Sequence, residues 1–315
     1  MITFEHVQKQ YADKLALDDL NLTIPTGEFF VLVGPSGSGK TTTLKMINRL
    51  IEPTAGIIKV DDRPLQDYDL RAMRLRMGYV LQNIALFPNL NIQENIAIQP
   101  ESLGWSRKRR LERARALLAQ VGLDPDQYAT KLPHELSGGE QQRVGIVRAL
   151  ATKPNVVLMD EPFSALDPLS RKQLQDLVLR LHQELQMTFV FVTHDMGEAL
   201  RLGQTIAVMR NGHIQQIGTG EEIMRHPAND FVRGFFENQK TPRAATVQSL
   251  LAQGYGEVTT APATLTATAT VGALAQALQT QTTVVVATAQ DHRALTTADL
   301  LGYLAAKEAT SRATD

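Results

Sequence analysis

Short runs of consecutive apolar residues recur along much of the chain. They are rich in Val, Leu and Phe, and they occupy residues 29–33, 78–81, 156–159 and 189–192. A short, uniformly apolar run is typical of a strand that is buried on both faces, as in a parallel sheet. We therefore expect these runs to form strands of one buried sheet.

Amphipathic stretches lie between these apolar runs. Apolar residues recur at helical spacing over residues 41–50, 107–120, 140–152 and 170–185. Strands that alternate with helices predict an α/β fold with a parallel sheet.

The first residues of the chain follow a different pattern. Residues 2–7 and 20–24 alternate between apolar and polar positions. This period of two predicts a small antiparallel β layer in front of the parallel sheet.

The composition changes near residue 238. From there to the end Thr and Ala dominate, charged residues become sparse and aromatic residues nearly disappear. We therefore expect a large domain at 1–237, a linker at 238–246, a small α+β module at 247–306 and a flexible tail at 307–315.

Within the small module, residues 271–278 and 297–306 are expected to form helices, and residues 283–287 a strand. The apolar side chains of these segments would make its core, namely Val271, Leu274, Leu278, Val284, Val286 and Leu300.

Composition narrows the class of protein. Of 315 residues, 43% are hydrophobic and 21% are charged, which is ordinary for a globular chain. The formal net charge of −1 argues against binding to nucleic acid through a basic surface, and the lack of Cys excludes thiolate metal sites. No secretory signal is visible, and no apolar run approaches the ~20 residues needed to span a bilayer. We expect a cytosolic protein that reaches a membrane only through a partner.

A glycine-rich motif follows the first buried run and precedes a predicted helix. It fits the pattern G-x-x-x-x-G-K-[ST] of a P-loop, and with the next residue it comprises Gly34, Pro35, Ser36, Gly37, Ser38, Gly39, Lys40, Thr41 and Thr42. The glycines let backbone amides point at phosphate oxygens, Lys40 would reach the terminal phosphates, and Thr41 would ligate Mg²⁺. A surface turn that fits the pattern by chance is the alternative, and the flanking strand and helix argue against it.

Two carboxylates end the run at 156–159. Asp160 is expected to provide the second contact of a P-loop protein to Mg²⁺, and Glu161 could polarise an attacking water as general base. Alone, such a pair is usually a solvated turn. Its presence beside a P-loop favours the catalytic interpretation.

A second candidate phosphate surface lies at the start of a predicted helix. Ser137 and Glu140 have the spacing of a capping box, which marks a helix N-terminus. The motif alone indicates a plain helix cap, but Gly138 and Gly139 clear side chains from the helix amides and permit close approach of a phosphate. Because the P-loop already surrounds the triphosphate from one side, this surface would close on the nucleotide of another subunit.

These motifs occur in the order and spacing of one family. Over residues 1–235 the chain resembles the ATP-binding subunit of an ABC transporter, with residues 136–141 as its signature. The resemblance implies a P-loop fold with a helical subdomain, binding of ATP and Mg²⁺, and a nucleotide sandwich between two copies of the chain. It also adds Gln82 to the ligands of Mg²⁺.

The resemblance assigns roles to further residues. Gln82 would sense Mg²⁺ and the membrane partner, and His194 would be the switch that contacts the γ-phosphate. The loop 164–167, ending at Asp167, would communicate across the dimer, and Tyr11 would stack on adenine. Without the family, Gln82 would be an exposed polar residue, Tyr11 an ordinary β-layer aromatic and His194 a structural histidine. The other histidines show no metal-ligand spacing and are interpreted as structural or solvated: His6, His134, His182, His213, His226 and His292.

Two stretches narrow the resemblance. Residues 44–54 and 82–88 are similar to the ATPase subunits of bacterial osmoprotectant importers, which take up glycine betaine, carnitine and choline. Residues 264–304 resemble one of the CBS motifs that often follow in such subunits, where a pair is usual. The tail could therefore be regulatory or a degenerate stabilising appendage.

The resemblance also implies partners and a location. We expect transmembrane permease subunits and, indirectly, an extracytoplasmic solute-binding protein, with the chain at the cytoplasmic face of the membrane and no nucleic acid. An ATPase for another small solute is the alternative, and a non-transport ABC ATPase is disfavoured because no coiled-coil insertion or second cassette is visible.

Overall fold

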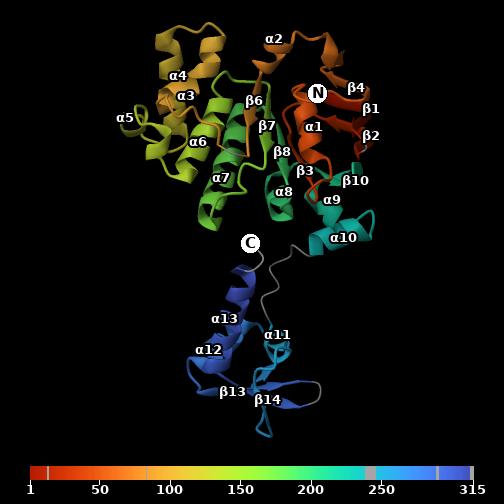
Figure 1. Cartoon of the computed structure of the whole chain (residues 1–315), viewed down its shortest axis with the longest axis vertical. Coiled ribbons are helices and arrows are strands. Elements are labelled where there is room, and N and C mark those ends of the chain that lie inside the picture. Colours follow the sequence, from red (N-terminus) through yellow and green to blue (C-terminus); the bar gives the residue numbers. More distant parts are fainter. Residues whose placement is uncertain (13, 83, 238–245, 289–290, 313–315) are drawn as a thin grey trace. The chain divides into compact units, whose positions relative to one another are not determined.

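The computed structural model describes residues 1–12, 14–82, 84–237, 246–288 and 291–312, with side chains omitted at 237 and 306–312 (Figure 1). The chain divides into two compact units, Met1–Phe236 and Glu237–Asp315. The boundary falls next to the position at which the composition changes.

The first unit contains alternating strands and helices. Its strands are β1 (Ile2–Tyr11), β2 (Lys14–Ile24), β3 (Phe29–Val33), β4 (Ala55–Val60), β5 (Arg63–Pro64), β6 (Met77–Val80), β7 (Val156–Asp160), β8 (Thr188–Thr193), β9 (Thr205–Arg210) and β10 (His213–Gly218). The α-helices that begin in it are α1 (Lys40–Ile47), α2 (Leu70–Arg74), α3 (Ile92–Ser102), α4 (Arg107–Gln120), α5 (Pro125–Tyr128), α6 (Gly138–Ala149), α7 (Pro168–Leu185), α8 (Met196–Leu202), α9 (Gly220–Arg225) and α10 (Asp230–Glu237). Short 3₁₀ turns occupy η1 (Leu65–Asp67) and η2 (Pro133–Glu135).

A six-stranded sheet with the order β10-β9-β3-β8-β7-β6 forms the centre of this unit. The pairings from β9 through β6 are parallel, and only the β9–β10 hairpin is antiparallel. The four apolar runs match β3, β6, β7 and β8, so the prediction of a buried parallel sheet is confirmed. β9 and β10 were not among the predicted strands. β9 does carry the apolar run 206–209, which was overlooked, whereas β10 has no such run.

Both faces of the central sheet are covered, which explains the uninterrupted apolar pattern of its strands. Along β3, Phe29, Val31 and Val33 belong to the cluster on one face. Phe30 and Leu32 belong to the cluster on the other face. A strand with only one buried face would alternate instead.

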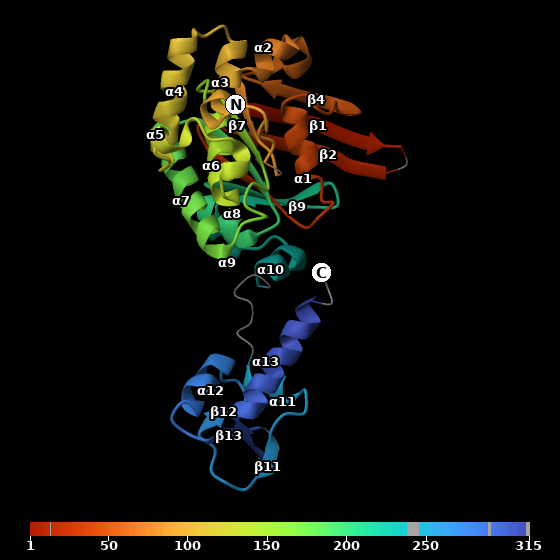
Figure 2. The same cartoon turned by 60° about the vertical axis from the view of Figure 1, so that its left-hand side comes forward.

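The predicted β layer is also present. β1 pairs antiparallel with β2 and β4 in a sheet of order β2-β1-β4-β5. Its apolar side chains, including Phe4 and Leu22, share a cluster with Leu32 of β3 and Leu44 of α1. Figures 1 and 2 show β1, β2 and β4 on one side of the central strands and helices α3–α6 on the other.

The helical segment between β6 and β7 corresponds to the helical subdomain that the family resemblance implied. It contains α3, α4, α5 and α6. Leu117 and Leu118 of α4 pack in one buried cluster with Ile146 and Val147 of α6. The apolar stripe of α4 is thus covered by its neighbours rather than by the sheet alone.

The second unit has its own core. It contains α11 (Val247–Leu251), β11 (Glu257–Thr259), β12 (Leu265–Thr266), α12 (Val271–Leu278), β13 (Thr283–Ala287), β14 (His292–Thr296) and α13 (Thr297–Arg312). Its sheet order is β11-β14-β13-β12. α12 and β13 coincide with the predicted helix and strand.

The core of the second unit differs from the prediction at two positions. Leu274, Val284, Val286 and Leu300 are buried as expected, whereas Val271 and Leu278 are only partly buried. Four further core residues were not predicted. Val247, Leu250 and Leu295 come from segments that were not assigned to the core, and Tyr303 comes from the predicted helix at 297–306.

The ends of this unit were predicted as a linker at 238–246 and a flexible tail at 307–315. α13 spans Thr297–Arg312 and so includes most of the predicted tail. Residues 313–315 lie outside the described part, as do 238–245 of the predicted linker. Thr246, the last linker residue, forms a β-bridge with Thr270.

Candidate nucleotide-binding site

The P-loop connects the carboxyl end of β3 to α1. Gly39 caps α1 in a left-handed conformation with φ of 104°, which favours glycine. A Cβ atom at Gly39 would lie 2.6 Å from Cδ2 of Leu17 in β2. Both the backbone angle and the close approach therefore require glycine here.

Lys40 is held inside the loop. Its Nζ donates hydrogen bonds to the carbonyl oxygens of Gly34 at 2.8 Å and Pro35 at 2.9 Å. The side chain is buried, and this burial lowers the pKa of the Lys40 ammonium, while the negative charges of Glu161 and Asp160 oppose the shift. The ammonium is thus a desolvated cation beside two carboxylates.

Thr41 and Asp160 are in direct contact across the site. The hydroxyl of Thr41 donates to Oδ1 of Asp160 at 2.8 Å, and Tyr79 Oη donates to Oδ2 at 3.4 Å. Burial, followed by the neighbouring charge of Asp160, raises the pKa of the Tyr79 phenol. A hydroxyl and a carboxylate are hard oxygen donors of the kind that Mg²⁺ prefers, so this pair fits that ion.

Glu161 begins the loop after β7 and meets His194, which follows β8. The backbone of Glu161 has φ of 44°, a left-handed conformation that costs about 1 kcal/mol for a residue with a side chain. Its amide donates to the carbonyl oxygen of Val192 at 3.0 Å, which ties this turn to the neighbouring strand. Oε2 of Glu161 lies 2.8 Å from Nδ1 of His194.

A cavity of about 260 Å³ unites most of the P-loop with two distant segments. It is lined by Tyr11, Lys14, Ala16, Ser36, Gly37, Ser38, Gly39, Lys40, Thr41, Thr42 and Glu161. Tyr11 is exposed at its rim, with Lys9 Nζ 4.9 Å from the ring centroid. Lys14 and Ala16 were not predicted, although their place in the same hairpin as Tyr11 was a usable signal.

Other predicted site residues do not line this cavity. The side chain of Gln82 is exposed and, among the described residues, makes no hydrogen bond to Thr41 or Asp160. Asp167 is the N-cap of α7, where its Oδ1 accepts the amides of Leu169 at 3.1 Å and Ser170 at 3.0 Å. Hydrogen bonds from Ser170 lower the pKa of Asp167.

The predicted capping box at the start of α6 is formed. Ser137 Oγ accepts the Glu140 amide, and Glu140 Oε2 accepts the Ser137 amide at 2.8 Å. Tyr128 Oη donates to Glu140 Oε1 at 2.6 Å, and this bond, with those from Ser137, lowers the pKa of Glu140. Among the described residues, and apart from the helix itself and the residues next to Gly138, no atom lies within 4 Å of a Cβ placed on Gly138. A Cβ placed on Gly139 would lie 3.8 Å from Oγ of Ser170, so this helix end is open at Gly138. None of these residues lines the P-loop cavity of the same chain.

Of the other histidines, His182 has the surroundings of a structural residue. His182 is buried against Phe29 and Phe189, and its Nε2 lies 2.9 Å from the carbonyl oxygen of Gly27. Within the described ranges, no group of three or more His, Cys, Asp or Glu residues is arranged to hold a metal ion.

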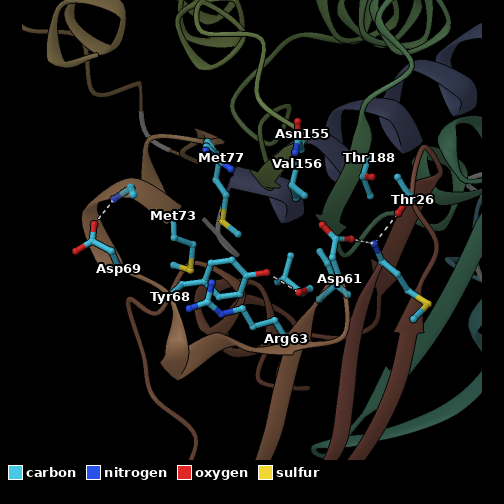
Figure 3. A pocket seen from close by; sticks show the side chains of 15 residues that line it. Thr26, Asp61, Arg63, Tyr68, Asp69, Met73, Met77, Asn155, Val156 and Thr188 are labelled. Carbon is cyan, nitrogen blue, oxygen red and sulfur yellow. Dashed lines mark hydrogen bonds and ion pairs between the residues drawn. The ribbon is translucent and has the colours of Figure 1, made fainter. Parts of the chain in front are cut away.

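A larger cavity, of about 470 Å³, lies at the opposite edge of the sheet (Figure 3). Met77, Val156 and Thr188, the first residues of β6, β7 and β8, contribute to its wall. The P-loop follows the carboxyl end of β3, and β3 runs parallel to β8. This cavity is therefore not part of the nucleotide site.

Comparisons with known proteins agree with this geometry. A model of the family described as "ABC transporter" matches residues 17–164. The choline transport ATP-binding protein OpuBA of Bacillus subtilis (strain 168) is 49% identical over 241 residues, which are 76% of this chain and 63% of OpuBA. The glycine betaine uptake system ATP-binding protein YehX of Escherichia coli (strain K12) is 48% identical over 236 residues, 75% of this chain and 76% of YehX.

The osmoprotectant import ATP-binding protein OsmV of Salmonella typhimurium is 45% identical over 272 residues, which cover 85% of this chain and 70% of OsmV. The dimeric structure of MJ0796, a bacterial ABC transporter cassette, superposes with a TM-score of 0.64 and 36% identity over 70% of this chain and 98% of MJ0796. Among the described helices, none combines the length and apolarity needed to cross a membrane. The matches to the family model and to these relatives show that the chain belongs to the family of ABC transporter ATP-binding proteins.

Proposed function

We propose that this protein is the ATP-hydrolysing subunit of a bacterial ABC importer for quaternary amine osmoprotectants. The observation that carries the ATPase assignment is the cavity that brings the P-loop together with Tyr11 and Glu161. The contact of Glu161 with His194 adds a candidate base and its partner.

Binding of ATP would use three segments of the cavity. Tyr11 would stack on the adenine, because base–aromatic contact is worth about 1–3 kcal/mol and tolerates loose hydrogen bonding. The P-loop amides and the amino end of α1 would receive the phosphates. Lys40 would exchange its contacts with the carbonyls of Gly34 and Pro35 for charge-assisted contacts with phosphate oxygens.

Mg²⁺ would be held by Thr41 and Asp160, with Gln82 as a further ligand. When bound, the ion would neutralise charge that develops on the phosphates. The contact between the Thr41 hydroxyl and the Asp160 carboxylate supports this assignment, because it places both oxygens at one point of the site.

Glu161 would act as the general base. Its turn is held by the hydrogen bond from the Glu161 amide to the carbonyl oxygen of Val192, so the carboxylate is anchored to the central sheet. Glu161 would take a proton from the attacking water, and His194 would orient the carboxylate through Nδ1 and contact the γ-phosphate.

A second copy of the chain would complete the site. Ser137, Gly138, Gly139 and Glu140 would present the open end of α6 to the nucleotide held by the partner's P-loop, and Asp167 would lie in the loop that faces the partner. Two observations support the sandwich: the end of α6 is open, and it does not line the P-loop cavity of its own chain. The similar cassette MJ0796 is described as dimeric.

The solute and the other partners follow from the relatives. OpuBA is named for choline transport, YehX for glycine betaine uptake and OsmV for osmoprotectant import. The chain spans 63% of the length of OpuBA. We propose that the chain powers uptake of the same class of solute. It would bind transmembrane permease subunits at the cytoplasmic face of the membrane and act indirectly with an extracytoplasmic solute-binding protein.

For the second unit we propose a single CBS-like module, within residues 247–306, that pairs with the module of the second copy. Its core is small, with eight buried hydrophobic residues among the side chains that the structure describes. Val258 and Leu301 are 65% and 61% exposed on its surface. Pairing two modules around the twofold axis of the ATPase dimer would cover such side chains.

Uptake by cells tests the proposed function. The chain would be expressed with the permease and binding protein encoded beside it, in a strain that lacks its own osmoprotectant importers, and uptake of radiolabelled glycine betaine, carnitine, choline and histidine would be measured. We expect uptake of a quaternary amine that disappears in Glu161→Gln. Uptake of histidine alone would favour an importer for another small solute and overturn the proposed substrate class.

A further inference from the structure

A buried carboxylate lies behind the turn that carries His194. Glu198, in α8, is 7% exposed. Its Oε2 accepts a 2.6 Å hydrogen bond from the hydroxyl of Thr193, the last residue of β8. The same hydroxyl accepts the amide of Asp195 at 3.0 Å, and Oδ1 of Asp195 accepts the amide of Glu198 at 3.1 Å. The residues on both sides of His194 are therefore fixed by hydrogen bonds that converge on Glu198.

Arg171 approaches the other oxygen of this carboxylate from α7. Its Nε lies 4.0 Å from Oε1 of Glu198, and its Nη1 lies 3.9 Å from Oδ2 of Asp195. Its Nη2 donates to the carbonyl oxygen of Leu166 at 3.2 Å. Leu166 belongs to the loop 164–167 between Glu161 and α7. One guanidinium thus spans from this loop to both carboxylates of the His194 turn.

The buried polar atoms of Arg171 and Glu198 are incompletely hydrogen-bonded. The Nε atom of Arg171 is buried and makes no hydrogen bond among the described residues. Gln175 donates to Oε1 of Glu198 only at 3.4 Å. Replacing a buried, incompletely hydrogen-bonded polar network by apolar side chains of similar volume is often neutral or stabilising. Stability alone is therefore a weak reason for these polar residues to be here.

The location of the network links it to the reacting groups. A small cavity of about 40 Å³ is lined by Glu161, Ser164, Arg171, Thr193, His194, Asp195 and Glu198. This space exceeds the roughly 10–15 Å³ that one water molecule needs. The same cavity touches the candidate base, the candidate switch histidine and both members of the Arg171–Glu198 pair.

We propose that Arg171 and Glu198 are positioning residues that couple the loop 164–167 to the His194 turn, so that the two segments move as one unit during ATP hydrolysis. The inference rests on the proposed function, because the loop would face the second copy of the chain. A displacement of that loop on dimer closure would be transmitted through Arg171 to the carboxylates of Asp195 and Glu198, and through Thr193 to His194.

The two helices offer a matched control. Arg201 of α8 forms an ion pair with Asp176 of α7, and the two side chains are 37% and 55% exposed. This pair joins the same helices as Arg171 and Glu198 but lines neither cavity at the site. The variants Arg201→Ala and Asp176→Ala therefore report on helix packing alone.

The test is a double-mutant cycle on the full chain assembled with its permease. Arg171→Ala, Glu198→Ala and the double variant would be compared for kcat and KM of ATP hydrolysis, with thermal midpoints to verify folding. We expect kcat to fall about tenfold or more in each single variant, because small misplacements of catalytic groups have effects of this size. KM should change little, the double variant should be no worse than the worse single variant, and Arg171→Lys should recover part of kcat.

Three results would overturn the coupling: an unchanged kcat in the single variants, equal losses in the Arg201 and Asp176 controls, or fully additive losses in the double variant. If Glu161→Gln abolishes hydrolysis while the Arg171 and Glu198 variants keep the wild-type kcat, only the present inference fails. If the wild-type assembly does not hydrolyse ATP at all, the proposed function fails and the inference fails with it.

Discussion

Nδ1 of His194 lies 2.8 Å from Oε2 of Glu161, although 33 positions separate the two residues in the chain. They meet because β7 and β8 are parallel neighbours, with Asp160 opposite Val192 in the register. The residues that follow the two strands therefore emerge at the same edge of the sheet. This relationship gives Glu161 a defined orientation and leads to the first prediction.

Replacing Glu161 with Gln should retain ATP binding and reduce hydrolysis by about 10²-fold or more, because a general base contributes in that range. The amide keeps the size of the side chain and a contact to His194. Nucleotide affinity would be measured by fluorescence titration and turnover by phosphate release. Glu184→Gln, at an exposed site on α7, is the control. Near-normal turnover in Glu161→Gln would contradict the assignment.

Lys40→Ala should weaken nucleotide binding itself. The ammonium is buried at the centre of the P-loop, and a charge-assisted hydrogen bond is worth about 1.5–3 kcal/mol, or roughly tenfold or more in affinity. Lys45→Ala, in the last turn of the same helix, should leave the affinity unchanged. Calorimetric titration with ATP would distinguish the two. Equal affinity of Lys40→Ala and wild type would argue against the P-loop interpretation.

Mixed dimers test whether the site is shared between two copies. Ser137→Arg would block the open end of α6, and Lys40→Ala would disable the P-loop, so that each homodimer should be inactive. A heterodimer of the two should contain one intact composite site and recover part of the hydrolysis rate. Tandem affinity tags would isolate the heterodimer before the assay. No recovery in a verified heterodimer would count against the sandwich.

Glu198 predicts a pH dependence of stability. Burial, and secondarily Asp195, raise the pKa of Glu198 above its ordinary value of 4.5, while Thr193, Arg171 and Gln175 oppose the shift. The folded state therefore binds this proton more tightly than the unfolded state. The resulting stabilisation is fully present at pH values below the pKa of Glu198 in the unfolded chain. It is lost as pH rises through the pKa of Glu198 in the folded protein.

Glu198→Gln removes this titration. The stability of this variant relative to wild type should increase as pH rises from the pKa of Glu198 in the unfolded chain through its pKa in the folded protein. At higher pH the difference should stay constant. Thermal midpoints of both proteins measured between about pH 4 and pH 8, the range in which carboxyl groups with raised pKa titrate, would show the difference. A difference that is flat over this range, as expected for the control Glu184→Gln, would contradict the raised pKa.

Truncation after Phe236 should leave the first unit folded, because its two buried clusters lie entirely within it. ATP hydrolysis should remain, whereas association of the two copies should weaken if the modules pair. Sedimentation of the truncated and full-length proteins over a range of concentrations would measure this association. Identical dimerisation, together with identical transport across ionic strengths, would identify the second unit as a passive appendage.

Local patterns were sufficient for the elements and for the chemistry of the P-loop. The apolar runs at β3, β6, β7 and β8 reflect burial on both faces, which leaves a signal in a few consecutive residues. The spacing of glycines before Lys40 is also local, because one tight loop must place its amides around phosphates. β9 was overlooked although residues 206–209 are uniformly apolar, whereas β10 has no apolar run and depends on its antiparallel pairing with β9.

The contacts between distant segments required the folded chain. Thr41 reaches Asp160, Lys14 joins the P-loop cavity, and Arg171 approaches Glu198 only because strand order and helix packing bring separate segments to one edge of the sheet. Periodicity reports which face of an element is buried, but it carries no information about which distant residue lies opposite. The identity of the reacting groups was therefore readable in short motifs, whereas their mutual arrangement depended on the register and packing of the whole first unit.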